Sequence, residues 1–537
     1  MKNERLIIEK AKNGRITCKY LINNNWKYLY SKYSPERIQT FNIDVNVDCV
    51  VMLGLGLGYE LSYIKKNTNK PIYIIESDES FIHALNKCPL LDDVNVLLGD
   101  KYKELNFKTK KIQVIQNMNL IECNISFYSK VLLDINRRTF EKNTIVVLEH
   151  KTISKDCANA FEKLGYKVSG LPWSHESILR RDIMKINPKY IFSVNFSPTL
   201  AKICEELQLF YISWTVDTPA YTLYLEGNGD NSKSICFVYD EKIVRDLTSK
   251  GLKNVFYMPV AANVERLTDI YLSSVDILKF KADISFVGSN GSKNEYKTSI
   301  KEYLSKDTEN KVEQIIFQQG FNDSYILKEM VTEKLLEEVQ DETGFILHRA
   351  EQIYLSPKEK FSFILGRYHS YLERTSIMKE LSNNFNLKIY GEEDWLLNEA
   401  KGILRSYQGY AEHYVEMPKV FKASKINLNI TRSFVETGLP MRVFDVLGSE
   451  AFLITNNKLD INRIFKPNSD LVVYRDIQDL KDIINYYLNH EIERNNIKKQ
   501  GYETVRKHHT YEVRVKEMMN LVKKLVINKS NDERRNI

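Results

Sequence analysis

Short apolar runs alternate with amphipathic segments along most of the chain. Runs such as VVMLG, YIIES and FLITN have the length of strands and stand next to Gly, Asn or Asp. The segments between them repeat apolar residues at helical spacing. Strands that alternate with helices are typical of parallel sheets covered by helices, so the pattern predicts an α/β protein.

The predicted strands fall into three groups, which we interpret as three Rossmann-like domains. The first group runs from DCVVMLGLGLG to TIVVLEH, the second from YKVSGL to NVFYMPVAA, and the third from ADISFVGSN to LVVYRD. A mostly helical segment follows the first strand of the third group, and we expect its apolar residues to form core. The predicted divisions are 1–142, 143–275 and 276–527, with the helical insertion at about 295–373 and a tail at 528–537.

Composition excludes several classes of protein. A chain of 537 residues is too long for one hydrophobic core. No apolar run approaches the roughly 18–20 residues of a membrane span, and the start MKNERLIIEK lacks the apolar core of a signal peptide. The seven cysteines form no C-x-x-C pair, which disfavours a zinc site and a disulfide framework. We therefore expect a cytoplasmic protein with reduced thiols, no metal site and no membrane span.

The charge of the chain is mildly positive. The net charge is +7, from 77 Lys and Arg against 70 Asp and Glu. Because basic residues are interleaved with acidic ones, the chain lacks the basic stripe of nucleic-acid-binding proteins. The small positive net charge could help to attract an anionic ligand, but it predicts no nucleic-acid partner.

A glycine-rich turn follows the first strand of the first group. Gly54, Gly56 and Gly58 stand between an apolar strand and a helix, and Glu76 ends the next strand, 18 residues after Gly58. Glycines let the backbone approach a ligand, and the carboxylate could bond ribose hydroxyls. The pattern fits an S-adenosylmethionine-type fold as well as a dinucleotide fold. It also fits a domain that has lost its ligand, since the acid usual before the first glycine of methyltransferases is missing.

Asp217 is the candidate catalytic residue of the second group. It follows the strand LFYISWTV directly. Side chains at the carboxyl ends of parallel strands face the ligand crevice, so Asp217 is placed to act as a general base or to accept a bond from a substrate hydroxyl. The alternative is a turn aspartate before Pro219.

Seven sequence blocks between about residues 145 and 525 are informative through their order and spacing. They are FSVNFSPTLAKICEELQLFYISWTVDTP, NVFYMPVAA, DISFVGSN, LKIYGEEDW, MPKVFKASKINLNITR, GLPMRVFDVLGSEAFLITNN and YETVRKHHTYEVRVKEMM. Together they resemble the CgeB-like (spore-maturation type) glycosyltransferases of the GT-B class. The resemblance implies two Rossmann-like domains facing across a cleft, with the sugar nucleotide mostly on the second and the acceptor mostly on the first. It also implies that no bound metal is required.

Two loops of the third group are expected to hold the nucleotide-sugar. DISFVGSN delivers Gly288, Ser289 and Asn290, a small, donor-rich loop that can approach a diphosphate or a sugar closely. LKIYGEED delivers Tyr390 and Gly391, which suit stacking or edge contact with a nucleobase.

Three charged side chains complete this predicted site. Arg442 opens the helix in GLPMRVFDVLG and offers donors that match phosphate oxygens, unless it is a surface salt-bridge partner. Asp445, one turn on, could bond ribose hydroxyls. The family usually has glutamate there, and the shorter aspartate puts that contact in doubt by roughly 1 Å. Arg432 is either a second phosphate ligand or simply solvated.

The N-terminal region carries a second resemblance. LYSKYSPERIQTFNIDV, VVMLGLGLGYELSYI and PIYIIESD resemble the motility accessory factor family, which modifies flagellin. This covers about a hundred residues, and it implies a protein-modification context without naming a catalytic residue.

The combined prediction is a bacterial GT-B glycosyltransferase that moves a sugar from a nucleotide donor, a UDP-sugar first, to an acceptor hydroxyl. The acceptor would be a Ser or Thr of a protein such as flagellin, and no cofactor would be required. One alternative is an S-adenosylmethionine-dependent methyltransferase fused to a glycosyltransferase. The other is a binding module with a catalytically dead cleft.

Overall fold

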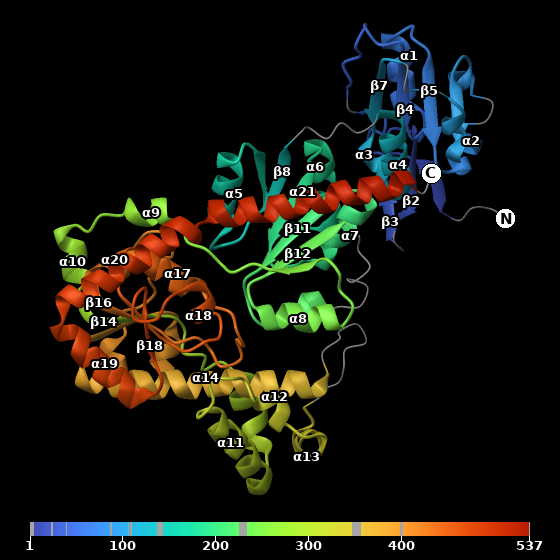
Figure 1. The fold of residues 1–537 in the computed structure, drawn as a ribbon. Helices are drawn as coiled ribbons and strands as arrows, with labels where there is room; N and C mark the ends of the chain where they lie inside the picture. Colours follow the sequence, from blue (N-terminus) through green and yellow to red (C-terminus); the bar gives the residue numbers. More distant parts are fainter. Residues whose placement is uncertain are drawn as a thin grey trace. The chain divides into compact units, whose positions relative to one another are not determined.

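The computed structural model describes residues 5–22, 25–38, 40–85, 88–105, 107, 110–136, 143–224, 233–345, 356–397 and 401–535. The chain forms two compact units, both of the α/β type (Figure 1). The first unit comprises Met1–Thr144, Ser174–Lys189 and Lys202–Leu209, and the second comprises Ile145–Trp173, Tyr190–Ala201 and Phe210–Ile537.

The first unit is built on a parallel sheet of four strands in the order β6-β5-β4-β7. All five residues of β4 are buried, as its continuous apolar run predicts. The strands are β4 (Cys49–Leu53), β5 (Ile72–Glu76), β6 (Asn95–Leu98) and β7 (Ile112–Gln116), with helices α1 (Tyr59–Asn67), α2 (Glu79–Ala84), α3 (Met118–Ile121) and α4 (Ile125–Asn136).

A three-stranded antiparallel sheet, which we did not predict from the sequence, precedes these strands. It consists of β1 (Leu6–Lys10), β2 (Ile16–Ile22) and β3 (Asn25–Tyr28). Only β2 has several fully buried residues, and Ile8 and Trp26 are exposed. Strands with so little burial lack the regular alternation that reveals a strand in a sequence.

The second unit contains two parallel sheets, the first with six strands in the order β13-β12-β11-β10-β8-β9. TIVVLEH forms β8 in this sheet, so grouping it with the first domain's strands was wrong; an apolar strand carries no mark of the sheet it joins. The strands are β8 (Thr144–Leu148), β9 (Lys167–Leu171), β10 (Tyr190–Val194), β11 (Phe210–Thr215), β12 (Ser234–Val238) and β13 (Val255–Tyr257). The helices between and after them are α5 (Ser154–Lys163), α6 (Glu176–Ile186), α7 (Pro198–Glu206), α8 (Glu241–Ser249), α9 (Val264–Thr268) and α10 (Ser274–Phe280).

The other sheet of the second unit has five parallel strands in the order β15-β14-β16-β17-β18. β15 pairs with one edge of β14, and β16 pairs with the other edge. The direction in which strands are added to the sheet therefore reverses between β14 and β16. Ligands of such sheets bind at this switch point, at the carboxyl ends of the strands. The strands are β14 (Ala282–Val287), β15 (Leu387–Tyr390), β16 (Ser424–Asn429), β17 (Leu453–Asn456) and β18 (Val472–Tyr474).

We call the parts built on these two sheets of the second unit the N-lobe and the C-lobe. The three parallel sheets confirm the predicted α/β class with several Rossmann-like domains. The exact predicted divisions stay predictions. The remaining helices of the C-lobe are α15 (Lys401–Ser406), α16 (Glu416–Ala423), α17 (Met441–Gly448), α18 (Ile461–Ile464), α19 (Ile477–Asn489) and α20 (Glu491–His508).

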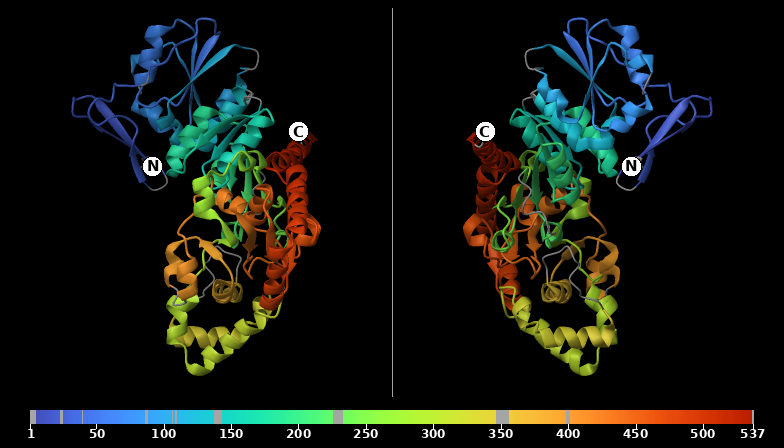
Figure 2. Two further views of the ribbon diagram at one scale, coloured as in Figure 1. Left: turned by 90° about the vertical axis from the view of Figure 1, so that its left-hand side faces the viewer. Right: turned by 90° about the vertical axis from the view of Figure 1, so that its right-hand side faces the viewer.

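A helical segment lies between β14 and β15, where we predicted an insertion. Its helices pack around a small apolar core of their own, which includes Val312, Leu336 and Leu365. The last helix, α14, begins with Pro357 behind a Ser356–Glu359 capping box; it is the long yellow-orange helix of Figure 1 and is viewed along its axis in Figure 2. The helices are α11 (Lys306–Gln319), α12 (Leu327–Met330), α13 (Glu333–Thr343) and α14 (Pro357–Asn384).

The C-terminal helix α21 (Tyr511–Arg535) leaves the C-lobe and packs on α5 of the N-lobe (Figure 1). Tyr511 meets Trp214 edge-on at 5.9 Å, and Val515 and Val522 join an apolar core that extends through both lobes. This helix therefore fastens the two lobes to each other by burying apolar surface.

Asp240 provides a polar link between the lobes. It is 1% exposed, caps α8 by accepting the Lys242 N–H at 2.9 Å, and also accepts the N–H groups of Thr437 and Gly438 at 3.1 Å each. The Thr437 hydroxyl donates to Oδ1 of the Asp240 carboxylate at 2.9 Å. Asp240 thus fixes the loop that leads into α17.

Two further expectations from the sequence were the lack of a membrane span and the presence of reduced thiols. Within the ranges that the structure describes, no helix is both long and apolar enough to cross a bilayer. All seven cysteines are free thiols, five of them buried.

Candidate functional site

A cavity of about 460 Å³, here called the central cavity, lies where the carboxyl ends of the N-lobe and C-lobe strands meet. The loops after β11, β14, β15 and β16 and the start of α17 line it. Seven of the residues predicted from the sequence lie there: Asp217, Gly288, Ser289, Gly391, Arg432, Arg442 and Asp445.

Two arginines hold Ser289 from opposite directions. Arg432 donates from Nη2 to the Ser289 hydroxyl at 2.7 Å. Arg374 donates from Nη1 to the Ser289 carbonyl at 2.7 Å and from Nη2 to the Ile430 carbonyl at 2.6 Å. Sequence reasoning missed Arg374, because it lies in the middle of α14 and no motif surrounds it. Its position seven residues after Arg367, on the same helix face, is the one available signal.

Burial disfavours the charge of both guanidinium groups. Burial lowers the pKa of Arg374, and the nearby charge of Arg432 lowers it further. Burial likewise lowers the pKa of Arg432. The Arg374 Nε is buried without a hydrogen-bond partner among the described residues. A bound anion would stabilise both charges and supply missing acceptors, so this edge of the cavity suits a phosphate group.

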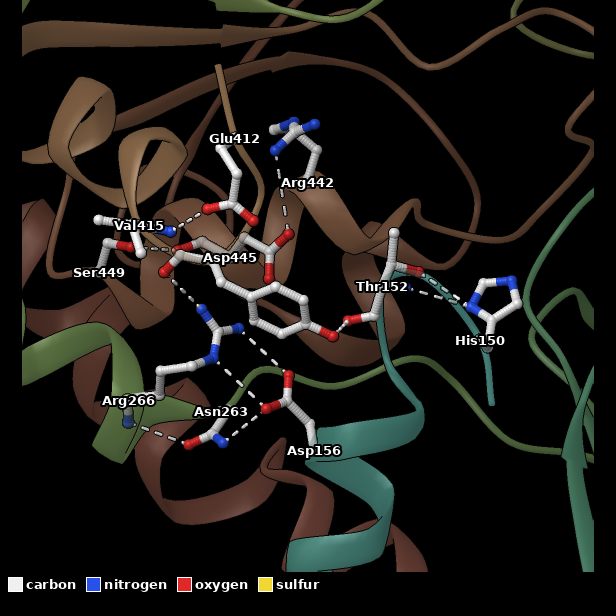
Figure 3. A network of polar contacts seen from close by, with 11 residues as sticks. His150, Thr152, Asp156, Asn263, Arg266, Glu412, Val415, Arg442, Asp445 and Ser449 are labelled. Carbon is white, nitrogen blue, oxygen red and sulfur yellow. Dashed lines mark hydrogen bonds and ion pairs between the residues drawn. The ribbon is translucent and has the colours of Figure 1, made fainter. Parts of the chain in front are cut away.

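Arg442 and Asp445 lie one turn apart at the start of α17 (Figure 3). An Arg442 nitrogen is 4.0 Å from an Asp445 oxygen, and the guanidinium lies 5.3 Å from the Phe421 ring and against the Met417 sulfur. Burial lowers the pKa of Arg442 and raises that of Asp445, and the Arg442 Nε has no partner within the described part of the chain. Arg442 is thus a partly buried cation with unused donors, not a surface salt-bridge residue.

A polar network behind Asp445 joins the two lobes (Figure 3). Tyr414 donates from its hydroxyl to the Thr152 carbonyl at 2.7 Å, and Arg266 donates to the Tyr414 carbonyl at 3.3 Å. Arg266 also pairs with the buried Asp156 at 3.1 Å. These bonds place His413, the neighbour of Tyr414, in the cavity lining, where burial lowers the pKa of its imidazole.

Asp217 is exposed at the carboxyl end of β11. The Asn195 side chain donates from Nδ2 to its Oδ2 at 2.7 Å and accepts the Val216 N–H at 3.1 Å. Asn195 therefore orients the carboxylate while leaving it in contact with solvent. Burial lowers the pKa of the His150 imidazole, and the charge of Asp217 opposes that effect. Sequence reasoning did not single out His150.

The structure corrects the placement of two predicted residues. Tyr390 is 3% exposed and packs against the Phe280 ring at 6.1 Å, so it belongs to the core and not to a base-stacking surface. Tyr410, which is 68% exposed, lines the cavity instead. Asn290 is buried and folds its own loop: its side chain accepts the Ser292 N–H and donates to the Asp394 carbonyl. The burial of Tyr390 and Asn290 could not be predicted from the sequence, because residues at strand ends alternate between the core and the cavity.

Gly391 is required by a close approach of two loops. A Cβ atom at this position would lie 2.3 Å from the Gly288 carbonyl oxygen. The Gly288 N–H donates to the Tyr390 carbonyl at 2.8 Å, and the indole N–H of Trp395 donates to the Gly288 carbonyl at 2.8 Å. The loop after β15 thus presses directly on the loop that carries Ser289.

Replacing Gly391 by alanine should lower the free energy of unfolding by about 2–3 kcal/mol, because the new methyl group would push backbone away from backbone. Urea unfolding followed by circular dichroism measures this. Gly170→Ala is the matched control, since a Cβ there meets nothing within 4 Å. Equal stability of the two variants would show that the loops can separate without cost.

The predicted ligand loop of the first unit is filled by the protein's own groups. The three glycines have positive φ angles, as expected for a tight turn, but a Cβ at Gly56 would lie 2.0 Å from the Tyr30 hydroxyl oxygen. Glu76 is 1% exposed and accepts the N–H groups of Leu55 at 2.6 Å and Ser77 at 2.7 Å and the Tyr128 hydroxyl at 2.9 Å. The carboxylate predicted to bond a ribose therefore holds the turn itself.

The other hydrogen-bonding groups around the Gly54–Gly58 turn also bond to groups of the protein itself. Tyr30 accepts the Leu57 N–H at 3.2 Å and donates to Glu60 at 3.0 Å, and Asn117 donates to the other Glu60 oxygen. Gly54 and Gly58 allow close packing of Leu120 and Leu90. Protein groups therefore take up the hydrogen bonds and the space at this turn, and ligand binding by this domain stays a prediction.

Over the described ranges, no three His, Cys, Asp or Glu side chains come close enough together to hold a metal ion. Metal independence itself stays a prediction.

Residues 374–520 match a family model described as glycosyl transferase-like. The match begins at Arg374 on α14 and extends through the C-lobe to α21, so the similarity to this family lies in that part of the chain. The CgeB-like and motility accessory factor assignments stay predictions. None of the curated proteins matches the chain at a significant level.

The chain is also similar to several solved structures. It is 9% identical to Anabaena HepE in complex with UDP-glucose (71% of this chain, 99% of that one, TM-score 0.42). It is 8% identical to the sucrose-phosphate synthase of Thermosynechococcus elongatus (72% and 100%, TM-score 0.42). It is 11% identical to the T4 phage protein BGT in complex with UDP-glucose (71% and 99%, TM-score 0.38). Similarity at this level says nothing about the substrate or the mechanism of this chain.

Proposed function

We propose that this protein is a GT-B glycosyltransferase that moves a sugar from a nucleotide donor to an acceptor hydroxyl. The observation that carries the proposal is the group of Arg374, Arg432 and Arg442 around one cavity, within a domain that matches a glycosyl transferase-like family. Their charges are only partly compensated by the protein, so a ligand that carries several negative charges would complete the site.

Each part of a nucleotide-sugar has a candidate partner in the central cavity. The diphosphate would lie between the Arg374–Arg432 pair and the start of α17, where the helix dipole adds to the positive potential. The ribose would reach Asp445, and the base would lie against Tyr410. We propose a UDP-sugar as the first donor to test, with no added cofactor or metal.

The arrangement supports a simple reaction. Asp217 accepts the proton of the acceptor hydroxyl, and the oxygen forms a bond to the anomeric carbon of the donor sugar. The bond from that carbon to the diphosphate oxygen breaks, and the leaving diphosphate keeps the electron pair. The arginines stabilise the charge that develops on it, which is the largest contribution such a site can make.

Two finer parts of the proposal rest on sequence alone. A serine or threonine of a protein such as flagellin is the acceptor that the N-terminal resemblance implies, and a cytoplasmic location fits a soluble nucleotide donor. The fused methyltransferase is the less favoured alternative, because Tyr30, Tyr128 and Glu76 fill its expected site.

Thermal shift with UDP-, GDP- and CMP-sugars tests the proposal, with EDTA in a parallel series. We expect one nucleotide class to raise the melting temperature and to release free nucleotide slowly when incubated with the protein, with or without EDTA. S-adenosylmethionine should leave the melting temperature unchanged. Stabilisation by S-adenosylmethionine alone, or binding of a sugar nucleotide without any turnover across an acceptor panel, would contradict the proposal.

A further inference from the structure

A second cavity of about 780 Å³ opens beside the central one, and we call it the α14 cavity. One face of α14 forms a wall of it, with Lys360, Phe363, Ile364 and Arg367 at the spacing that places side chains on the same side of a helix. Arg374, seven residues further along, reaches the central cavity. One helix that originates in the insertion therefore lines both cavities.

One side of the α14 cavity is aromatic. Tyr221 meets Phe363 edge-on at 5.8 Å, and Phe363 meets Phe434 at 4.7 Å with ring planes 66° apart. Phe345 and Ile364 extend this apolar surface. The rings hold one another in fixed positions, so they present a rigid wall and not a loose patch.

Polar and charged groups also line this cavity, and one of them, Arg367, comes from the same face of α14 as Phe363. Arg367 pairs with both oxygens of Glu295, at 2.7 and 2.9 Å, and donates to the Lys293 carbonyl at 3.1 Å. Glu392 and Lys293, both exposed, line it as well. The cavity thus offers donors and acceptors together with an apolar surface.

The two cavities meet at a shared border. Thr218, Ser289, Glu392, Arg432 and Phe434 line both. Asp217, adjacent to Thr218, lines the central cavity at this border. A hydroxyl group that projects from the α14 cavity would therefore arrive next to the proposed base and to the arginines that hold the donor's diphosphate.

We infer that the α14 cavity is the acceptor subsite and that the acceptor group it takes is a sugar ring. This inference rests on the proposed function and names the substrate class of that same site, in place of the serine or threonine that the N-terminal resemblance implies. A pyranose has an apolar C–H face and a rim of hydroxyls, which matches a lining that combines aromatic rings with polar groups. A serine or threonine side chain has only two or three heavy atoms beyond Cα and would leave most of a cavity of this size empty, whereas cavities of about 300–1,000 Å³ enclose whole small molecules.

The step joins two sugars. The acceptor hydroxyl loses its proton to Asp217, its oxygen bonds to the anomeric carbon of the donor, and the nucleoside diphosphate leaves with the electron pair of the broken bond. The product is a glycoside longer by one sugar, and no oxidant or further reactant is needed.

Nucleotide release in the presence of an acceptor panel tests this inference with the full-length protein. The panel contains methyl and p-nitrophenyl glycosides of common hexoses and N-acetylhexosamines, and serine- or threonine-containing peptides. The variants are Tyr221→Ala and Phe363→Ala, because both residues line the α14 cavity and neither lines the central cavity. Phe317→Ala is the matched control, because Phe317 is an exposed aromatic residue of the same insertion that lies outside both cavities.

We expect at least one glycoside to accelerate nucleotide release, with a glycoside KM about tenfold higher in Tyr221→Ala and Phe363→Ala and a donor KM within about twofold of the parent value. Phe317→Ala should match the parent in both. Acceleration by peptides only, acceleration by no glycoside, or equal glycoside KM values in all variants would each overturn the inference while leaving the transferase activity standing. Failure to turn over any donor at all would instead contradict the proposed function.

Discussion

Replacing Arg432 by alanine is expected to lower nucleotide release from the sugar donor by about 100- to 1,000-fold. Loss of a single donor to a developing oxyanion typically has an effect of this size in a partly buried site. Arg432 donates to the Ser289 hydroxyl, and burial and then the charge of Arg367 lower the pKa of its guanidinium, so a bound phosphate would stabilise its charged form. Steady-state kinetics with the donor identified by thermal shift measures the loss.

Arg405→Ala is the control for this experiment. Arg405 is an exposed arginine on α15 in the same lobe and lines neither cavity. Circular dichroism would establish that both variants are folded. If Arg432→Ala keeps the parent turnover, the diphosphate is not bound at this edge of the cavity and the arrangement of the donor must be different.

Replacing Asp217 by asparagine is expected to lower the rate of transfer by about 100- to 10,000-fold, the usual contribution of a general base. The amide keeps the size of the carboxylate and its oxygen can still accept from Asn195, so the loop should keep its geometry. Donor binding should persist, because the arginines of the C-lobe are unchanged. Single-turnover rates measure the first effect, and thermal shift with the donor measures the second.

Asp269→Asn controls for the loss of one negative charge, because Asp269 is exposed and lies outside both cavities. A rate for Asp217→Asn within threefold of the parent would remove Asp217 from the chemistry. It would then be a turn residue before Pro219, the alternative that the sequence left open.

The sequence was informative where local chemistry decides the structure. The buried strand before Gly288, the helix that starts at Met441 and the placement of Arg442 and Asp445 one turn apart follow from apolar runs, a Pro-led helix start and helical spacing. The meeting of Asp217 with these residues followed from the rule that parallel strands present their carboxyl ends on one edge.

The N-terminal glycine turn shows how a correct local prediction can mislead about function. Gly54, Gly56 and Gly58 adopt the positive φ angles that the motif requires. What occupies the space above the turn is decided by Tyr30 and Tyr128, which come from other segments of the chain. A sequence motif predicts the backbone conformation of a turn. It does not show which side chain from a distant segment fills the space above that turn.

By itself, the sequence determined the α/β class, the helical insertion, and seven of the residues that line the central cavity, because strand length, helical spacing and glycine turns are properties of adjacent residues. Tertiary structure alone decided that Arg374 joins Arg432, that Tyr390 and Asn290 are buried, and that one face of α14 lines a second cavity. Those outcomes depend on which distant segments pack together, and burial, unpaired donors and pKa shifts arise only when they do.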